Sequence, residues 1–223
     1  MVFAVELQLY MPLTVCLGMP RVCACGEPTD PRGHHVLQCL LTDANKVRHD
    51  IFTKLFARTL RELGIVANWE PKYRYPENPA ARADLELPHI RSMGPIECDL
   101  TIVTPWATGG ELVRRGNESG RAAKAAEKNK REKYEGNGLR RRADNPKLYT
   151  LAIEVCGRRG EEWRRFDRYI STRLEELKWG PRWRYYRDIV PKYNAWLTIE
   201  TYQKALTVGK RIQQVYCDRC LST

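Results

Sequence analysis

The sequence has no apolar run that approaches the roughly 20 residues of a membrane span. Its first twenty residues contain Glu6 and no lysine or arginine, so they lack the basic start of a secretory signal. There is no internal repeat, and no low-complexity tract beyond the arginines Arg140, Arg141 and Arg142. These absences predict a protein of a reducing compartment, nuclear or cytoplasmic, that is neither secreted nor embedded in a membrane.

The composition is that of a globular chain with an anionic partner. The 223 residues suffice for one domain, or one with a small appendage, and 43% of them are apolar. The net charge is +11, and it is concentrated in one half of the chain. Residues 111–223 carry 27 basic and 15 acidic side chains, a net +12, whereas residues 1–110 carry 11 and 12. We therefore expect an anion, such as a nucleic acid, to bind the second half.

Aromatic residues interrupt the basic stretch around residues 161–187. Lysine and arginine neutralise phosphates and aromatic rings stack on bases, so this mixture is typical of nucleic-acid binding. Helical spacing offers a second interpretation, in which the apolar residues form a buried stripe and the arginines lie on the solvated face. The stripe would consist of Trp163, Phe166, Ile170, Leu174 and Leu177.

The order of apolar patterns predicts an α/β fold with a small central mixed sheet flanked by helices. The predicted elements are a helix at 44–63 ended by Gly64, strands at 65–75, 82–90 and 96–104, a helix at 121–135, a strand at 148–156, a helix at 161–178, and a C-terminal helical region broken by Pro181 and Pro191. We expect three parts: an N-terminal segment, 1–43; the α/β core, 44–178; and a helical basic extension, 179–223.

A short loop near the N-terminus carries a set of residues that suits zinc. Three thiols, Cys23, Cys25 and Cys39, lie within seventeen positions of one another, together with the pair His34 and His35. Three thiolates and one imidazole form a tetrahedral zinc set, which leaves no open position and is therefore structural. The residues alone do not select the histidine. The alternative is a set of reduced cysteines beside a surface histidine pair.

The other cysteines carry less information. Cys98 and Cys156 lie on predicted strands, where a buried thiol behaves as a small apolar side chain. Cys217 and Cys220 form an isolated pair, for which we favour no metal.

Two aspartates are candidates for a second metal site. If strands 82–90 and 96–104 form a hairpin, alternation places Asp84 and Asp99 on one face. The opposite face would carry Leu85, Leu87, Leu100 and Ile102. Two neighbouring carboxylates repel, and Mg²⁺ or Mn²⁺ relieves the repulsion. Lys130, on the next predicted helix, shares a face with Glu127 and Tyr134. The alternative is that these groups are ordinary surface charges.

The motifs occur in an order that resembles a known family. They are Cys-x-Cys-Gly with His35 and Cys39, Arg82-x-Asp84, Asp99-Leu-Thr-Ile-Val, and Ala-Glu-x-x-Lys130-x-x-Lys133-Tyr134. Together they resemble the zinc knuckle plus restriction-like endonuclease that follows the reverse transcriptase of site-specific non-long-terminal-repeat retrotransposons, a branch of the PD-(D/E)XK nuclease superfamily. The resemblance spans roughly residues 15–160.

The resemblance implies a role for each matching residue. It makes segment 1–43 a CCHC zinc knuckle, with His35 rather than His34 as ligand, and segment 44–178 the endonuclease core. Asp84 and Asp99 would hold Mg²⁺ or Mn²⁺. Thr101 stands where the superfamily usually has its lysine, and Ala83 where it has proline. In this branch the lysine comes from the following helix, which implies Lys130, with Lys133 and Tyr134 as companions.

The function implied is metal-dependent hydrolysis of a DNA phosphodiester, a nick that primes reverse transcription at an insertion site. DNA, element RNA and a reverse transcriptase in the same polyprotein are the expected partners, and Arg82 and the run 140–142 are candidate nucleic-acid contacts. Glu70, Glu154 and Asp50 are further candidate acids. Two alternatives stay open: a catalytically inactive zinc-knuckle module that binds nucleic acid, and a zinc-stapled protein-interaction domain.

Overall fold

The fold is described from a computed structural model of the chain. The described residues are 21–23, 25–29, 35, 39, 44–71, 75, 82–88, 94–104, 120–136, 146–155, 157–176, 184 and 188. Their elements are helix α4 (Ala44–Glu62), strands β1 (Asn68–Trp69), β2 (Leu85–Leu87) and β3 (Ile96–Val103), helix α6 (Arg121–Gly136), strand β4 (Lys147–Glu154) and helix α7 (Glu161–Glu176).

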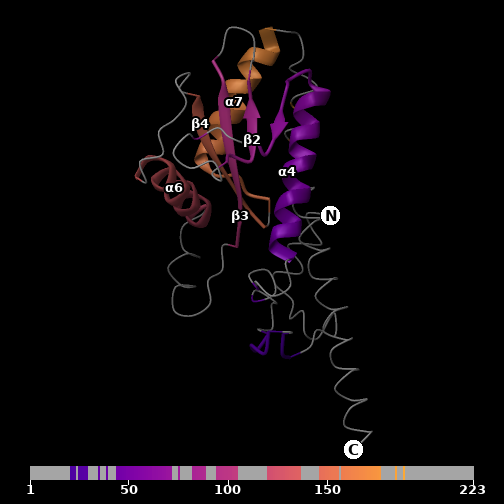
Figure 1. Ribbon diagram of the computed structural model, residues 1–223, viewed down its shortest axis with the longest axis vertical. Helices are drawn as coiled ribbons and strands as arrows, with labels where there is room; N and C mark the ends of the chain where they lie inside the picture. The colour runs from indigo at the N-terminus through magenta and orange to yellow at the C-terminus, as the bar shows by residue number, and fades with distance from the viewer. Residues whose placement is uncertain are drawn as a thin grey trace, which may run out of the picture.

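A four-stranded mixed sheet forms the centre of the fold. The strands lie in the order β1-β2-β3-β4; β1 and β2 are antiparallel, β2 and β3 are antiparallel, and β3 and β4 are parallel. Parallel neighbours require a crossover connection, and α6 lies on the one between β3 and β4. Figure 1 shows the sheet between α6 on one side and α4 on the other. The predicted α/β class with a small mixed sheet is confirmed.

One face of the sheet is apolar and is covered by α4 and α7. Its buried strand residues are Leu85, Leu87, Ile96, Cys98, Leu100, Tyr149, Leu151 and Ile153. Trp163 of α7 packs against two phenylalanines of α4, with ring centroids 5.9 Å from Phe52 and 5.3 Å from Phe56. The stripe on α7 is therefore core as far as Leu174, so the second interpretation is confirmed for residues 161–174. Leu177 lies outside the described residues.

Helix α4 ends as its glycine predicts. Gly64 has a φ of +76°, a conformation that costs glycine little. The N–H of Ile65 donates to the Leu60 carbonyl at 3.0 Å, and the N–H of Gly64 donates to the Arg61 carbonyl at 2.8 Å. This pair of bonds is the Schellman motif, and the buried Leu60 and Ile65 supply its apolar contact.

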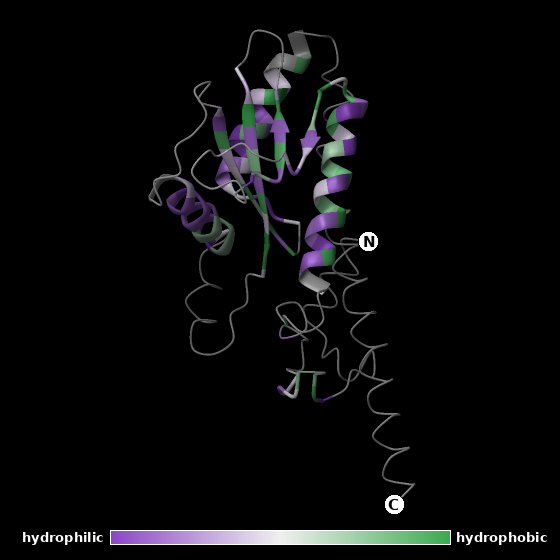
Figure 2. Ribbon diagram, in the orientation of Figure 1, coloured by the Kyte–Doolittle hydropathy of each residue, from purple (hydrophilic) through white to green (hydrophobic). Residues whose placement is uncertain are grey.

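The other face of the sheet is acidic and lies under α6. Glu86 is paired with Glu97 across β2 and β3, and both are buried, as are Asp99 and Glu154. Tyr75 donates a hydrogen bond to Glu97 at 2.7 Å. Among the described residues, an apolar cluster of Tyr75, Tyr134 and Leu148 also lies on this side. Figure 2 shows α6 as a mainly hydrophilic helix, whereas α4 carries alternating hydrophilic and hydrophobic bands.

A buried carboxylate of α6 caps α7. Glu127 accepts hydrogen bonds from the backbone N–H groups of Glu161, Glu162 and Trp163 at 3.1 to 3.4 Å. These N–H groups have no partner inside their own helix, and a negative charge is favoured there. Gly160 makes room, since a Cβ at that position would lie 1.9 Å from Glu127 Oε1. Glu127 thereby fixes α6, and with it Lys130 one turn later.

The two short strands differ most from prediction. β1 spans only Asn68–Trp69, because Glu70 has a φ of +44° and Pro71 follows, so Glu70 is not carried on a strand. β2 spans only Leu85–Leu87, ended by Pro88, which lacks a backbone donor. The other boundaries agree to within two residues. Of segment 179–223 the structure describes only Arg184 and Asp188, both with helical backbone.

Candidate active site and metal centre

A tight turn positions the first two thiols of the N-terminal cluster. The N–H of Gly26 donates to the Cys23 carbonyl at 2.9 Å, and the N–H of Cys23 donates to the Glu27 carbonyl at 2.8 Å. Gly26 has a φ of +89°, which an L side chain rarely adopts. A bridge between Val22 and Pro28 closes the turn. The turn brings Cys23 and Cys25 to one side of the loop.

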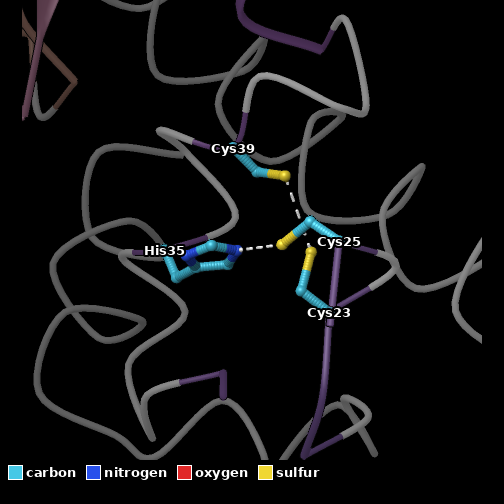
Figure 3. A group of neighbouring side chains, drawn as sticks. All are labelled: Cys23, Cys25, His35 and Cys39. Carbon is cyan, nitrogen blue, oxygen red and sulfur yellow. Dashed lines mark hydrogen bonds between the residues drawn. The ribbon is translucent and has the colours of Figure 1, made fainter. Parts of the chain in front are cut away.

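The side chains of Cys23, Cys25, His35 and Cys39 converge on one point, as Figure 3 shows. Their ligand atoms all lie within 4.8 Å of one another. Cys23 Sγ is 3.7 Å from Cys39 Sγ, and Cys25 Sγ is 3.1 Å from His35 Nε2. A tetrahedron with Zn–S bonds of about 2.3 Å has S···S edges of about 3.8 Å. The cluster could hold a zinc ion, and His35 is its histidine; His34 lies outside the described residues.

The four cysteines among the described residues are all free thiols. Burial raises the pKa of Cys23 to about 11, whereas a hydrogen bond from the Glu27 backbone lowers the pKa of Cys25 to about 7. Zinc ligands must be thiolates, so a bound ion would release the proton that burial retains on Cys23.

The predicted hairpin brings the two aspartates together. Leu85 is the partner of Cys98 across β2 and β3, and continuing this register one residue places Asp84 opposite Asp99. The Leu100 N–H donates to Asp84 Oδ2 at 2.6 Å. The two carboxyls are close enough for a hydrogen bond between them to affect the pKa of each. The predicted pairing across the hairpin is confirmed.

Lys130 reaches from α6 to the second carboxylate. Its Nζ donates to Asp99 Oδ1 at 3.1 Å and lies 3.0 Å from Oδ2, though without the alignment of a hydrogen bond to the latter. The Asp99 side chain is only 4% exposed. The Thr101 side chain is on the same strand face, two residues further on, and its hydroxyl is buried without a hydrogen-bond partner. The cation beside Asp99 therefore comes from the helix and not from the strand.

His49 is a member of this group that the sequence did not reveal. Its Nε2 lies 3.1 Å from the Leu100 carbonyl oxygen and 3.3 Å from Asp84 Oδ2. Because a carbonyl only accepts, Nε2 must carry the hydrogen. A single histidine on a helix carries no pairing signal, and Leu100 is 51 positions away. Only the packing of α4 beside β3 brings the ring to the carboxylate.

The two aspartates have opposite pKa shifts. Burial, then the charge of Asp84, raises the pKa of Asp99 to about 7 against the attraction of Lys130. Burial also disfavours the Asp84 anion, but the hydrogen bond and charge of His49 outweigh it, so the pKa of Asp84 is lowered. Burial lowers the pKa of His49, yet its contacts with Asp84 raise it to about 9. Asp84 is therefore the first of the two carboxyls to ionise as the pH rises.

The remaining candidates lie at different distances from this centre. Tyr134 is buried and donates to the Arg82 carbonyl at 3.2 Å, and burial raises its pKa. Lys133 lies on the exposed side of α6. The Arg82 guanidinium is 3.3 Å from Glu70 Oε2. Among the described residues, Asp84, Asp99, Lys130 and His49 form the centre, and Tyr134 supports it from α6.

The other acids have different places. Asp50 lies 3.5 Å from His49 Nδ1 at the edge of the group, and Glu154 is buried at the end of β4. Arg140, Arg141, Arg142, Cys156, Cys217 and Cys220 lie outside the described residues.

The carboxylate centre fits a hard divalent cation. Its donors are carboxylate oxygens, and Asp99 Oδ2 is buried without a hydrogen bond of its own. Mg²⁺ is commonly held by one or two carboxylates, with water and phosphate oxygens as the other ligands. Two aspartates are therefore enough as the protein ligands of such an ion.

The chain matches no protein-family model and no curated protein. Within the described part of the chain, every helix is too short or too polar to cross a membrane.

Proposed function

We propose that this protein is a metal-dependent DNA endonuclease with a restriction-like core and an N-terminal zinc knuckle. The observation that carries the proposal is Lys130, whose ammonium reaches Asp99 from α6 beside Asp84. The resemblance requires a lysine from this helix, because Thr101 occupies the strand position. The order of a helix, three strands, a crossover helix and a parallel strand supports the same core.

The residues of the centre have distinct tasks in this proposal. Asp84 and Asp99 would hold Mg²⁺ or Mn²⁺, which when bound supplies a Lewis acid for a phosphate oxygen and lowers the pKa of a coordinated water. Lys130 offsets negative charge on the phosphate and orients the attacking water. His49 holds Asp84 through Oδ2, the oxygen that also accepts the Leu100 N–H. Tyr134 fixes the backbone at Arg82, two residues before Asp84.

The zinc cluster has a structural task in this proposal. Four protein ligands saturate zinc, and a bound ion can fold a loop that has few apolar residues. Purified protein should contain one zinc per chain, and Cys39→Ser should lose it. Elemental analysis after gel filtration measures both, and zinc-free parent protein that keeps its knuckle protected from proteolysis would contradict the assignment.

A plasmid-nicking assay tests the activity. Supercoiled DNA with Mg²⁺ is incubated with the parent, Asp84→Asn, Lys130→Gln and the control Lys128→Gln, which removes an exposed α6 lysine paired with Glu132. We expect the parent and the control to nick, and both centre variants to lose at least about 100-fold in rate. Equal nicking by all four proteins would indicate a contaminating nuclease and contradict the proposal.

One observation favours a second function, a catalytically inactive module that binds nucleic acid. Both aspartates already have a cationic neighbour, His49 for Asp84 and Lys130 for Asp99. Such neighbours stabilise buried carboxylates without any metal. In that case no protein in the assay nicks DNA in Mg²⁺ or Mn²⁺, while all four bind it.

The resemblance also extends the proposal to partners. A nick would supply the 3′ hydroxyl from which a reverse transcriptase of the same element begins synthesis, and element RNA would bind beside the DNA. Primer extension from the nicked site by an added polymerase tests whether the product end is a free hydroxyl.

A further inference from the structure

A cationic groove runs along the β4 edge of the sheet, apart from the carboxylate centre. It has a volume of about 560 Å³ and is bounded by α6, the start of β4 and α7. Its charged residues are Arg131, Lys147, Glu162 and Arg165. Three cations against one carboxylate give the lining a net charge of +2. No residue of the proposed metal centre lies in it.

Lys147 is the least compensated charge in this groove. Its Nζ lies 4.4 Å from the ring centroid of Tyr169 and 4.9 Å from that of Tyr149. Within the described residues no carboxylate lies within 4.0 Å of it, whereas Arg131 and Arg165 both pair with Glu162, at 2.6 and 2.8 Å. Cation–π contacts fix the ammonium without neutralising it. Among the described residues this ammonium therefore has no counter-ion, and a cation held in place in this way is suited to bind an anion.

The backbone at this edge adds hydrogen-bond donors. In β4 the Glu154 N–H and the Ala152 carbonyl point away from β3, since they bond to the backbone of residues 158–160. Alternation makes the N–H groups of Leu148 and Thr150 point the same way, and no described residue accepts from them. Leu148 lines the groove, so an anion there would meet its N–H group as well as the side chains.

We propose that this groove binds the phosphates of a nucleic-acid strand. The choice of a nucleic acid among polyanions rests on the proposed function; the anion site itself does not. A phosphodiester matches the chemistry, because arginine forks and an ammonium bind phosphate oxygens. The groove is one strand away from the candidate active centre, as Cys98, next to Asp99, is the β4 partner of Tyr149.

Fluorescence anisotropy of a labelled DNA duplex tests the groove, using zinc-loaded full-length protein without Mg²⁺ and a range of NaCl concentrations. The variants are Lys147→Gln and Arg165→Gln. Lys128→Gln is the matched control, since it removes the same charge from an exposed helix position outside the groove. We expect each groove variant to weaken binding about 3- to 10-fold at low salt, and to reduce the slope of log K against log salt by about 0.9.

Three results would overturn the inference. The first is that Lys147→Gln and the control give the same affinity and slope. The second is that the parent does not bind DNA. The third is that a labelled polyglutamate peptide, and not DNA, binds in a Lys147-dependent way, which would assign the groove to an acidic protein. Arg165 is 55% exposed, so its variant should fold even if Lys147→Gln does not.

A nicking measurement on the same variants separates this inference from the proposed function. If DNA binds through the groove and neither the parent nor any variant cuts it, the proposed endonuclease activity is wrong and the groove remains a nucleic-acid-binding site. If the parent cuts DNA and the groove variants bind it as tightly as the control, the groove is not a DNA-binding site and the proposed endonuclease activity is unaffected.

Discussion

The two faces of the sheet are built from the same strands and differ in almost everything else. On the α4 and α7 side, alternate residues of β2, β3 and β4 are apolar and pack against aromatic rings. On the α6 side, the intervening residues include Glu86, Glu97 and Asp99, each buried. Apolar burial favours folding, whereas a buried carboxylate opposes it unless paired. The first face should set the stability of the protein, and the second its chemistry.

The largest expected effect on stability comes from the centre of the apolar face. Trp163→Ala removes a ring packed against Phe52 and Phe56, and we expect the free energy of unfolding to fall by about 3 to 5 kcal/mol. Urea unfolding followed by circular dichroism measures this. Val66→Ala is the control, because Val66 is 56% exposed and should change little. If Trp163→Ala also lowered the nicking rate per folded molecule, the apolar face would contribute to activity as well as to stability.

The reverse pattern is expected on the acidic face. Asp99→Asn should abolish nicking, yet make the protein more stable relative to the parent as the pH rises. The folded-state pKa of Asp99 is about 7 and its ordinary value is 3.8. Between these values the folded state binds a proton that the unfolded state does not, so the stability of the parent falls as the pH rises through this window. The asparagine side chain does not titrate, so the variant does not lose this stability as the pH rises.

Urea unfolding at pH 5 and pH 8, without added Mg²⁺, checks this prediction. The difference in unfolding free energy, variant minus parent, should increase by on the order of 2 kcal/mol between the two pH values. A difference that is the same at both would show that Asp99 is ionised throughout. Since His49 also loses a proton above neutrality, the comparison is made with the parent at the same pH.

The junction between the faces gives a smaller effect. Gly160→Ala places a methyl group against the Glu127 carboxylate that caps α7, and overpacking of this kind costs about 1 to 3 kcal/mol. Gly94→Ala is a matched control, because a Cβ there would meet no atom within 4 Å. Thermal unfolding of the two variants should separate them. Equal melting temperatures would mean that α6 shifts freely, and Lys130 would then not be fixed by Glu127.

The smallest expected effect comes from the orientation of Asp84. His49→Ala should slow nicking about 10-fold, which corresponds to about 1.4 kcal/mol of transition-state stabilisation. His49→Gln should restore most of the rate, since its amide also donates near the Leu100 carbonyl. Arg58→Ala, at an exposed position of α4, is the control. If His49→Gln nicks DNA as slowly as His49→Ala, the His49 ring acts through its charge or packing and not through the hydrogen bond to the Leu100 carbonyl.

Local chemistry explains which parts of the fold could be predicted. Gly64 predicts the end of α4, because its αL conformation is a property of one residue. The long strands and helices follow from apolar periods of two and 3.6 residues. The predicted strand at 65–75 is too long because Glu70 adopts a positive φ, which its residue type does not indicate. The predicted strand at 82–90 is too long because Pro88, which lacks a backbone donor, ends β2. The prediction of Asp84 opposite Asp99 was correct because side chains alternate with a period of two along each strand of a hairpin, so the face of each residue follows from its position.

The sequence by itself determined the ligand types and their order: the three thiols with a histidine, the two aspartates and the lysine on the following helix. Alternation along the hairpin also predicted that the two aspartates meet, but tertiary structure alone decided the other contacts. It brought the ligand atoms of the three thiols and His35 within 4.8 Å of one another, brought His49 to Asp84 from 35 positions away, and joined Arg131, Lys147 and Arg165 into one groove. The physical reason is that periodicity fixes the face of an element on which a residue lies, whereas the packing of elements fixes what that face meets.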